Sequence, residues 1–250
     1  MHYNNKNIVI TGAASGIGLA LTQKLAEFQG VKILATDINP ISTELPNSVI
    51  CHQGDISKPE QIDGLLDLAE GELGQIDIFI ANAGFAYYEK QQASWQRIHD
   101  IFSCNTFSPI YTAQVMAERY STPFQILITA SFMGYHSLAG YALYSATKSA
   151  LIAWADSYRW EKPDNASVSV LCPVATKTEF FQTKAPVPWP AQTAEQVANA
   201  ALKGLAKYQR IIFPSQLSQI SRLINWLLPI TLPFYQHIEA LKFKNWLKSN

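Results

Sequence analysis

A tyrosine and a lysine four residues apart, in the segment YSATK (144–148), are the residues of this chain with the clearest chemical potential. In a helix, Tyr144 and Lys148 lie one turn apart, so both side chains project from the same face. An ammonium beside a phenol favours the phenolate, which predicts a Tyr144 pKa below the usual value of about 10. Such a tyrosine can exchange a proton with a hydroxyl or carbonyl group. An ordinary amphipathic helix can carry the same spacing, so the surrounding elements must decide.

A glycine-rich segment, TGAASGIG (11–18), follows the apolar run NIVIT and precedes a helical pattern. Gly12, Gly16 and Gly18 permit a tight turn and let a pyrophosphate approach the backbone N–H groups of a helix N-terminus. The alternative is a glycine-rich turn without a ligand. Asp37 ends the next predicted strand, 19 residues after Gly18, near the spacing of about 20 expected for a carboxylate that binds the ribose of NAD. The carboxylate would repel the 2′-phosphate of NADP, so NAD is favoured over NADP. The alternative is that Asp37 only ends a strand in a turn and binds no cofactor.

Short apolar runs alternate with helical patterns along the chain and must position these residues. Runs typical of strands occupy 7–11, 31–37, 48–55, 76–84, 124–131, 167–173 and 210–214. Helical periodicity occupies 16–29, 58–71, 93–120, 141–161 and 193–208. Strands separated by helices indicate parallel βαβ crossovers. We therefore predict an α/β fold, a doubly wound parallel sheet (Rossmann fold) of about seven strands with helices on both faces.

The chain divides into two predicted units. Residues 1–214 form a single catalytic domain that binds the nucleotide and the substrate, and residues 215–250 form a C-terminal helical extension. The proline-rich segment APVPWP (185–190) predicts an irregular loop within the first unit.

Further segments complete a pattern in register: GDI (54–56), ANAG (81–84), CN (104–105), Ser131 and CPVATKT (172–178). With the glycine segment and YSATK, they make residues from about 6 to 180 resemble the short-chain dehydrogenase/reductase family. Ser131 lies thirteen positions before Tyr144, as the family pattern requires. The resemblance implies an oxidoreductase that transfers a hydride between a nicotinamide cofactor, NAD favoured, and an alcohol or carbonyl substrate.

The resemblance also implies a role for each matching residue. Tyr144 is the general acid/base, Lys148 tunes it and holds the nicotinamide ribose, and Ser131 binds the substrate oxygen. Asn105 orders a water in the proton relay. The implied cofactor-binding residues are Gly12, Ser15, Gly16, Ile17, Gly18, Asp37, Asp55, Ile56, Asn82, Ala83, Gly84, Tyr144, Lys148, Pro173, Thr176 and Thr178.

Two positions depart from the family pattern. Ala81 replaces an asparagine that the family often has, and Val174 stands after Pro173 where the family usually has glycine. A Cβ at Val174 shifts the backbone that lines the nicotinamide pocket, which affects the expected placement of Thr176 and Thr178.

Aromatic residues near the predicted site indicate a hydrophobic substrate, although they can equally pack the core. They are Phe85, Tyr87, Tyr88, Phe132, Tyr135, Phe180, Phe181 and Trp189. The rival function is a catalytically silent nucleotide-binding protein with a regulatory or scaffold role. The intact Ser131, Tyr144 and Lys148 argue against that rival.

Composition restricts the remaining classes. The formal net charge is zero, which provides no basic field for nucleic acid. The first apolar run, IVI, is too short for a signal-peptide core, and Cys51, Cys104 and Cys172 form no C-x-x-C pair, so we expect a cytoplasmic protein. The five histidines form no metal-ligand pattern, and no metal is expected.

The resemblance further implies a homo-oligomer, a dimer or tetramer, paired through helices near 98–120 and 144–160. The second of these helices carries Trp154, Tyr158 and Trp160, and aromatic residues are enriched at interfaces. Light scattering would test this expectation.

The C-terminal extension is basic and amphipathic. Residues 203–250 hold seven Lys or Arg against Glu239 alone, a formal charge of +6. Apolar residues from Leu217 to Leu227 recur at helical spacing, and the run 223–235 contains two prolines and is too short to span a bilayer. Three interpretations remain open: the extension covers the substrate pocket, pairs subunits, or makes peripheral contact with an anionic membrane.

Overall fold

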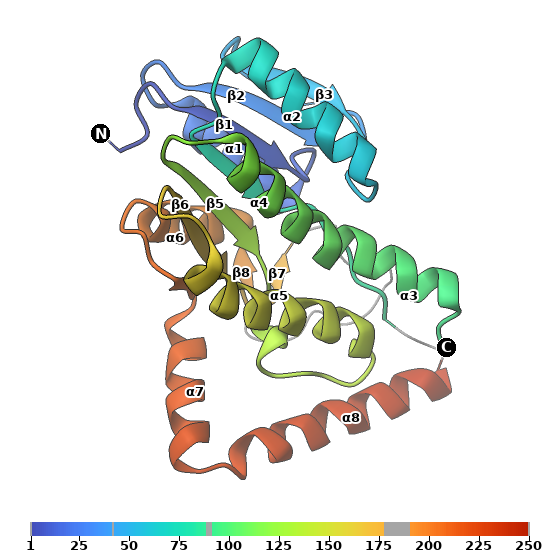
Figure 1. Ribbon diagram of the computed structural model, residues 1–250. Coiled ribbons are helices and arrows are strands. Elements are labelled where there is room, and N and C mark those ends of the chain that lie inside the picture. The colour runs from blue at the N-terminus through green and yellow to red at the C-terminus, as the bar shows by residue number, and fades with distance from the viewer. Residues whose placement is uncertain (1, 42, 89–91, 178–190, 250) are drawn as a thin grey trace.

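A seven-stranded parallel sheet forms the centre of the protein (Figure 1). The computed structural model describes residues 2–41, 43–88, 92–177 and 191–249. The strand order is β3-β2-β1-β4-β5-β6-β9. The strands are β1 (Asn7–Thr11), β2 (Lys32–Asp37), β3 (Val49–Gln53), β4 (Ile78–Ala81), β5 (Phe124–Thr129), β6 (Ala166–Leu171) and β9 (Ile211–Ile212). Each lies within a predicted apolar run except β6, which begins one residue earlier than predicted, and the predicted doubly wound α/β fold is confirmed.

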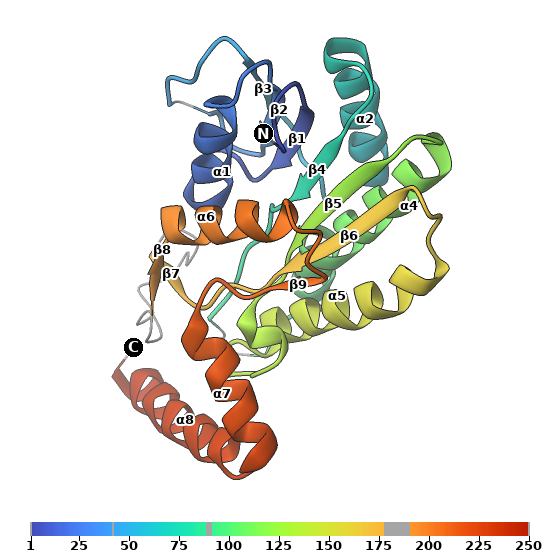
Figure 2. The same cartoon turned by 90° about the vertical axis from the view of Figure 1, so that its left-hand side faces the viewer.

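Helices cover both faces of this sheet. Figure 2 shows α1 (Gly16–Ala26) and α6 (Ala194–Leu205) on one side, and α2 (Pro59–Leu73), α4 (Ser108–Arg119) and α5 (Ala142–Glu161) on the other. Successive strand residues point to opposite faces, so Ile8 and Ile10 pack under α1 while Val9 packs under α2. Because both faces of the central strands are buried, β1, β4 and β5 are largely apolar, which is why they were recognisable as continuous runs.

The predicted helix over 93–120 is interrupted. It consists of α3 (Trp95–Phe102), a π-helical turn (Ser103–Phe107) and α4. Pro109 lies in the first turn of α4, where its missing N–H removes a hydrogen bond from the preceding turn. The π-helical turn carries Cys104 and Asn105, and such turns often occur at functional sites. Sequence periodicity did not predict it.

Two further strands, β7 (Thr176–Lys177) and β8 (Gln192–Thr193), form a small parallel pair that the sequence did not predict. Two residues are too few to show an alternating pattern. The predicted loop over 185–190 lies outside the described residues, and the division of the chain at residue 214 stays a prediction.

The C-terminal residues form two helices, α7 (Gln216–Leu227) and α8 (Thr231–Ser249), which meet at a sharp corner (Figure 1). The backbone N–H of Leu232 donates to the Asn225 side-chain oxygen (3.1 Å) and fixes this corner. Further along α8, the rings of Phe243 and Trp246 pack on Tyr88, with centroids 5.2 and 4.5 Å away. No helix in the described part of the chain is long and apolar enough to cross a membrane.

Candidate active site

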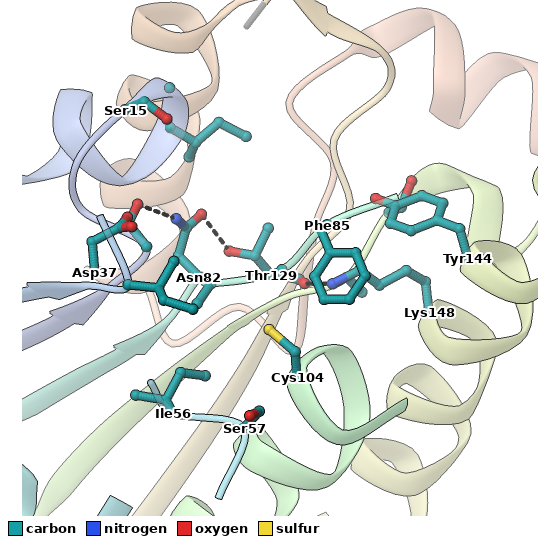
Figure 3. A pocket seen from close by; sticks show the side chains of 18 of the residues that line it. Ser15, Asp37, Ile56, Ser57, Asn82, Phe85, Cys104, Thr129, Tyr144 and Lys148 are labelled. Atoms are coloured by element: carbon teal, nitrogen blue, oxygen red, sulfur yellow. Dashed lines mark hydrogen bonds between the residues drawn. The ribbon is translucent and has the colours of Figure 1, made fainter. Parts of the chain in front are cut away.

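A cavity of about 640 Å³ lies where β1, β4 and β5 end, and Figure 3 shows the side chains around it. The carboxyl edge of a parallel sheet is where ligands of such folds bind. Most of the predicted site residues line this cavity: Gly12, Ser15, Gly16, Ile17, Asp37, Asp55, Ile56, Asn82, Ala83, Gly84, Ser131, Tyr144, Lys148, Pro173 and Thr176. Gly18 and Asn105 do not line it. Thr178 lies outside the described residues, as do Phe180, Phe181 and Trp189.

The glycine segment forms a tight turn between β1 and α1. Gly12 has a φ of +68° and Gly16 a φ of +55°, a backbone region that residues with a Cβ rarely adopt. A Cβ on Gly12 would lie 2.7 Å from the Cα of Ala83. A Cβ on Gly18 would overlap the carbonyl oxygen of Gly12. The glycines therefore let the turn fold back on itself and leave the N-terminus of α1 open to the cavity.

Asp37 is held by the backbone on two sides. Its carboxylate accepts hydrogen bonds from the N–H of Ala14 (3.0 Å) and from the N–H of Asn39 (2.9 Å). The first bond ties the end of β2 to the glycine turn. Each carboxylate oxygen keeps a lone pair for a further donor. Lys58, at the start of α2, also lines the cavity.

Asn82 connects the glycine turn to the lysine. Its amide nitrogen donates to the carbonyl oxygens of Thr11 and Gly12, each at 3.2 Å, and its oxygen accepts from the Thr129 hydroxyl at 3.2 Å (Figure 3). The Thr129 carbonyl oxygen in turn accepts from the Lys148 ammonium at 2.8 Å. A continuous hydrogen-bond network therefore runs from the proposed phosphate end of the cavity to its other end.

The Ser131, Tyr144 and Lys148 side chains meet at that other end. The Ser131 hydroxyl accepts from the Met133 N–H (3.1 Å) and is hydrogen bonded to Tyr144. The Lys148 nitrogen lies 5.7 Å from the centroid of the Tyr144 ring. Both residues belong to α5 and are buried, with 8% of Tyr144 and 3% of Lys148 exposed.

The predicted lowering of the Tyr144 pKa is wrong. Burial raises the pKa of Tyr144 to about 12, and the hydrogen bond from Ser131 offsets only part of this rise. Burial also lowers the pKa of Lys148 to about 8. The physical reason is that desolvation penalises the charged form of both groups, and the Lys148 ammonium is bonded to a backbone carbonyl instead of the phenol.

Asn105 fastens the segment after β4 to α5. Its oxygen accepts from the Phe85 N–H (3.0 Å), and its nitrogen donates to the Phe85 carbonyl oxygen (2.9 Å) and the Thr147 hydroxyl (3.2 Å). A Cβ on Gly84 would lie 3.0 Å from the Asn105 oxygen, so glycine allows this close approach. The water-ordering role of Asn105 stays a prediction.

Sequence reasoning missed several residues that line the cavity, among them Ser57, Cys104, Thr129 and Met133. Cys104 was named as part of the CN segment but given no role, and burial raises its pKa to about 11. Each missed residue lies within two positions of a residue that was singled out, at a strand end or in a turn. That proximity was the available signal.

The aromatic residues expected around a substrate divide between sites. Phe85 and Tyr87 line the cavity. Tyr88 is buried in a cluster with Tyr144 that α8 covers. Phe132 borders a second cavity, described below.

The helix proposed for subunit pairing presents only part of its aromatic surface. Trp154 stacks on Tyr158 with centroids 4.5 Å apart, whereas Trp160 is 78% exposed. The homo-oligomer stays a prediction.

Comparisons with known proteins agree with this geometry. The chain matches the family model described as short chain dehydrogenase over residues 6–187. The curated protein 1-deoxy-11-beta-hydroxypentalenate dehydrogenase of Streptomyces exfoliatus is 30% identical over 197 residues, which cover 73% of this chain and 71% of that protein.

Solved structures share the fold at lower identity. A short-chain dehydrogenase/reductase from Burkholderia phymatum in complex with NAD has a TM-score of 0.78 at 21% identity, covering 92% of this chain and 96% of its own. A short-chain dehydrogenase from Sphingobium yanoikuyae in complex with NADPH has a TM-score of 0.75 at 22% identity, covering 90% of this chain and 94% of its own.

Proposed function

The chain belongs to the short-chain dehydrogenase/reductase family, and on this premise we propose that it interconverts an alcohol and a carbonyl compound, with Tyr144 as the general acid/base. One observation carries the proposal. Ser131, Tyr144 and Lys148 meet at one end of a cavity whose other end is a glycine turn at a helix N-terminus.

The cavity fits a dinucleotide. The glycine turn packs closely on Ala83, which a Cβ at Gly12 would prevent, and the α1 N-terminus offers backbone N–H groups to a pyrophosphate. Asp37 would bind the adenosine ribose and Lys148 the nicotinamide ribose. The nicotinamide would supply or accept the hydride. The matching residues Asp55, Ile56, Pro173 and Thr176 line the cavity between these points.

Tyr144 would act as an acid in carbonyl reduction. With a pKa of about 12, its phenol is protonated at neutral pH and can donate to a carbonyl oxygen that also accepts from Ser131. Lys148, with a pKa of about 8, is largely an ammonium at pH 7. Its positive charge, close to the ring, stabilises the phenolate left after proton transfer.

NAD is the proposed cofactor. The Asp37 carboxylate lines the cavity and would repel a 2′-phosphate. Lys58 and Lys148 are the cationic side chains among the described residues that line the cavity, and Lys58 is the one that could favour NADP.

The function is tested by comparing wild type with Tyr144→Phe on a panel of ketones, aldehydes and alcohols. Turnover should fall about 10²- to 10⁴-fold, because only proton transfer is lost. NADH binding, followed by its fluorescence, should be retained. Tyr141→Phe is the matched control, because it removes the same hydroxyl from a buried tyrosine one turn earlier and should keep near-normal turnover. Near-normal turnover of Tyr144→Phe would contradict the assignment of Tyr144 as the general acid/base.

The rival function is a silent nucleotide-binding protein. It expects NADH binding without oxidation or reduction of any compound in the panel. The same panel, run on wild type, therefore separates the two functions.

We also propose that the corner between α7 and α8 makes peripheral contact with an anionic membrane. Trp226 is 78% exposed and Ile230 is 75% exposed, and both lie at this corner with Leu228 and Phe234. The surrounding segment, 203–250, carries the formal charge of +6, which complements anionic lipid headgroups. Amphipathic segments with basic residues bind such surfaces.

A further inference from the structure

A second cavity, of about 410 Å³, lies between the C-terminal helices and the turn that follows β5. Its volume falls within the range of roughly 300–1,000 Å³ typical of small-molecule pockets. We call it the α7–α8 groove. Its walls come from the 3₁₀ turn η2 (Phe132–Gly134) and the residues after it, from the segment after Pro173, and from α7 and α8.

The walls of the α7–α8 groove are apolar. Leu217, Ile220 and Ile224 line it from α7, and Leu232 and Tyr235 line it from α8. No Asp, Glu, Lys or Arg is found among the described residues that line it. A charged group would therefore lose its hydration there without gaining a partner.

The serine hydroxyls on the α7 wall are hydrogen bonded to backbone carbonyl oxygens of the same segment. The Ser218 hydroxyl donates to the Ser215 carbonyl oxygen (2.6 Å), and the Ser221 hydroxyl donates to the Ser218 carbonyl oxygen (3.0 Å). The Asn225 oxygen accepts from Leu232, and the His136 ring packs on Phe132 with centroids 4.4 Å apart. The groove therefore presents a hydrocarbon surface.

The groove is continuous with the candidate active site. Ser131, Met133, Val174 and Ala175 line both cavities. A substrate whose oxygen is bound by Ser131 thus has an apolar channel open beside its reacting carbon. Val174, which replaces the glycine usual in the family pattern, stands at the junction.

We propose that the α7–α8 groove binds an aliphatic arm of the substrate, with Val174 as a specificity-determining residue at its entrance. The inference rests on the proposed function and names its substrate class: ketones, aldehydes or alcohols that carry a hydrocarbon chain and no charge on it. The occupant is the substrate because the groove is continuous with the place where Ser131 would bind the substrate oxygen.

The test is a homologous series of methyl ketones from butanone to dodecanone. Affinity is measured by calorimetry on NADH-loaded Tyr144→Phe, whose turnover is suppressed, and kcat/KM is measured in parallel on the wild type. Burial of each methylene should tighten binding about fourfold until the groove is full. A series with no gain per methylene would overturn the inference.

Variants localise the effect to the groove. Ser221→Trp fills it from α7 and should reduce the gain per methylene, whereas Gln219→Trp, an exposed neighbour outside the groove, should keep it. If Ser221→Trp does not fold, Ile224→Asn serves, because Ile224 is partly exposed and tolerates a polar group. Equal gains in wild type and in the folded groove variant contradict the assignment.

Val174→Gly tests the entrance of the groove. It should relax selection against ketones branched beside the carbonyl. An unchanged ratio of turnover with branched to turnover with linear ketones would show that Val174 does not determine specificity.

The two readouts keep the hypotheses apart. A binding gain without turnover supports the groove and contradicts the proposed function. Turnover that is independent of chain length supports the function and contradicts the groove.

Discussion

The cavity and the C-terminal helices depart from the usual distribution of residues in opposite directions. At the cavity, the chain buries Lys148, which is 3% exposed and donates to the Thr129 carbonyl oxygen, with no carboxylate of the described residues as its ion-pair partner. At the corner of α7 and α8, it exposes Trp226 and Ile230. Buried charges and large exposed apolar groups are both unfavourable for an isolated domain. The proposed cofactor at the cavity and the proposed membrane contact at the corner would each offset one of these two unfavourable features.

Among the effects expected on cofactor choice, membrane binding and stability, the largest concerns Asp37, another charged side chain at the cavity. Replacing it should lower the ratio of kcat/KM for NADH to that for NADPH about 10- to 100-fold, because a hydrogen bond to a charged group is worth about 1.5–3 kcal/mol. Asp37→Ala also loses the bonds to both Ala14 and Asn39, whereas Asp37→Asn removes the charge and keeps one of the two acceptor oxygens. Steady-state kinetics with both cofactors provides the measurement.

Lys58→Ala is the control for this comparison. If Lys58 attracts a 2′-phosphate, its removal should lower turnover with NADPH and leave turnover with NADH near normal. A wild-type protein that already prefers NADPH would show that the interpretation of Asp37 is wrong.

Motifs predicted the cavity well because its residues are tied to local structure. Asp37 ends a strand, the glycine turn and Ser131 each follow one, and the carboxyl ends of parallel strands meet at one edge. Spacing of this kind can be identified from the chain alone. The pKa of Tyr144 could not be predicted in this way, because it depends on burial by residues distant in sequence, including those of the cluster covered by α8.

The C-terminal helices were predicted less completely. The apolar stripe indicated helical structure, and α7 contains it. Periodicity does not reveal what a stripe packs against, so Leu217 and Ile220 gave no sign of the groove. The π-helical turn with Asn105 was also missed, although Pro109 in the first turn of α4 is a residue type that removes a helical hydrogen bond.

The next effect tests the exposed side of the comparison. Full-length protein should sediment with phosphatidylserine-containing liposomes at low salt and be released at high salt, because the attraction is partly electrostatic. Trp226→Ser combined with Ile230→Ser should weaken partitioning into the liposomes about tenfold. A fully buried apolar side chain contributes about 1.5–3 kcal/mol, and a side chain at a membrane surface is only partly buried and contributes less.

Trp95→Ser is the matched control for the corner. Trp95 is 79% exposed but lies on α3, so its loss should leave liposome binding unchanged. Protein that remains in the supernatant at low salt would contradict the membrane contact.

The smallest expected effect is on stability, and it tests whether the buried charge at the cavity opposes folding. The Lys148 pKa is lowered from 10.5 to about 8, so between these values the unfolded chain binds more protons than the folded chain. The destabilisation caused by burying this charge is therefore absent above about pH 10.5, grows as pH falls, and is complete below about pH 8. Lys148→Met removes the buried charge together with the hydrogen bond to Thr129, and we expect a net gain of about 1 kcal/mol, or about 2–4 °C in Tm, at pH 7. Turnover should be lost. Thermal unfolding followed by circular dichroism from pH 7 to 10 should show the gain shrinking as pH rises.

Lys32→Met is the control for this prediction. Lys32 is exposed, so the variant should keep the wild-type slope of stability against pH. A Lys148→Met protein that is less stable than wild type at pH 7, with an unchanged slope of stability against pH, would mean that the Lys148 ammonium stabilises the fold. The cavity would then hold no unfavourable buried charge to compare with the exposed apolar corner.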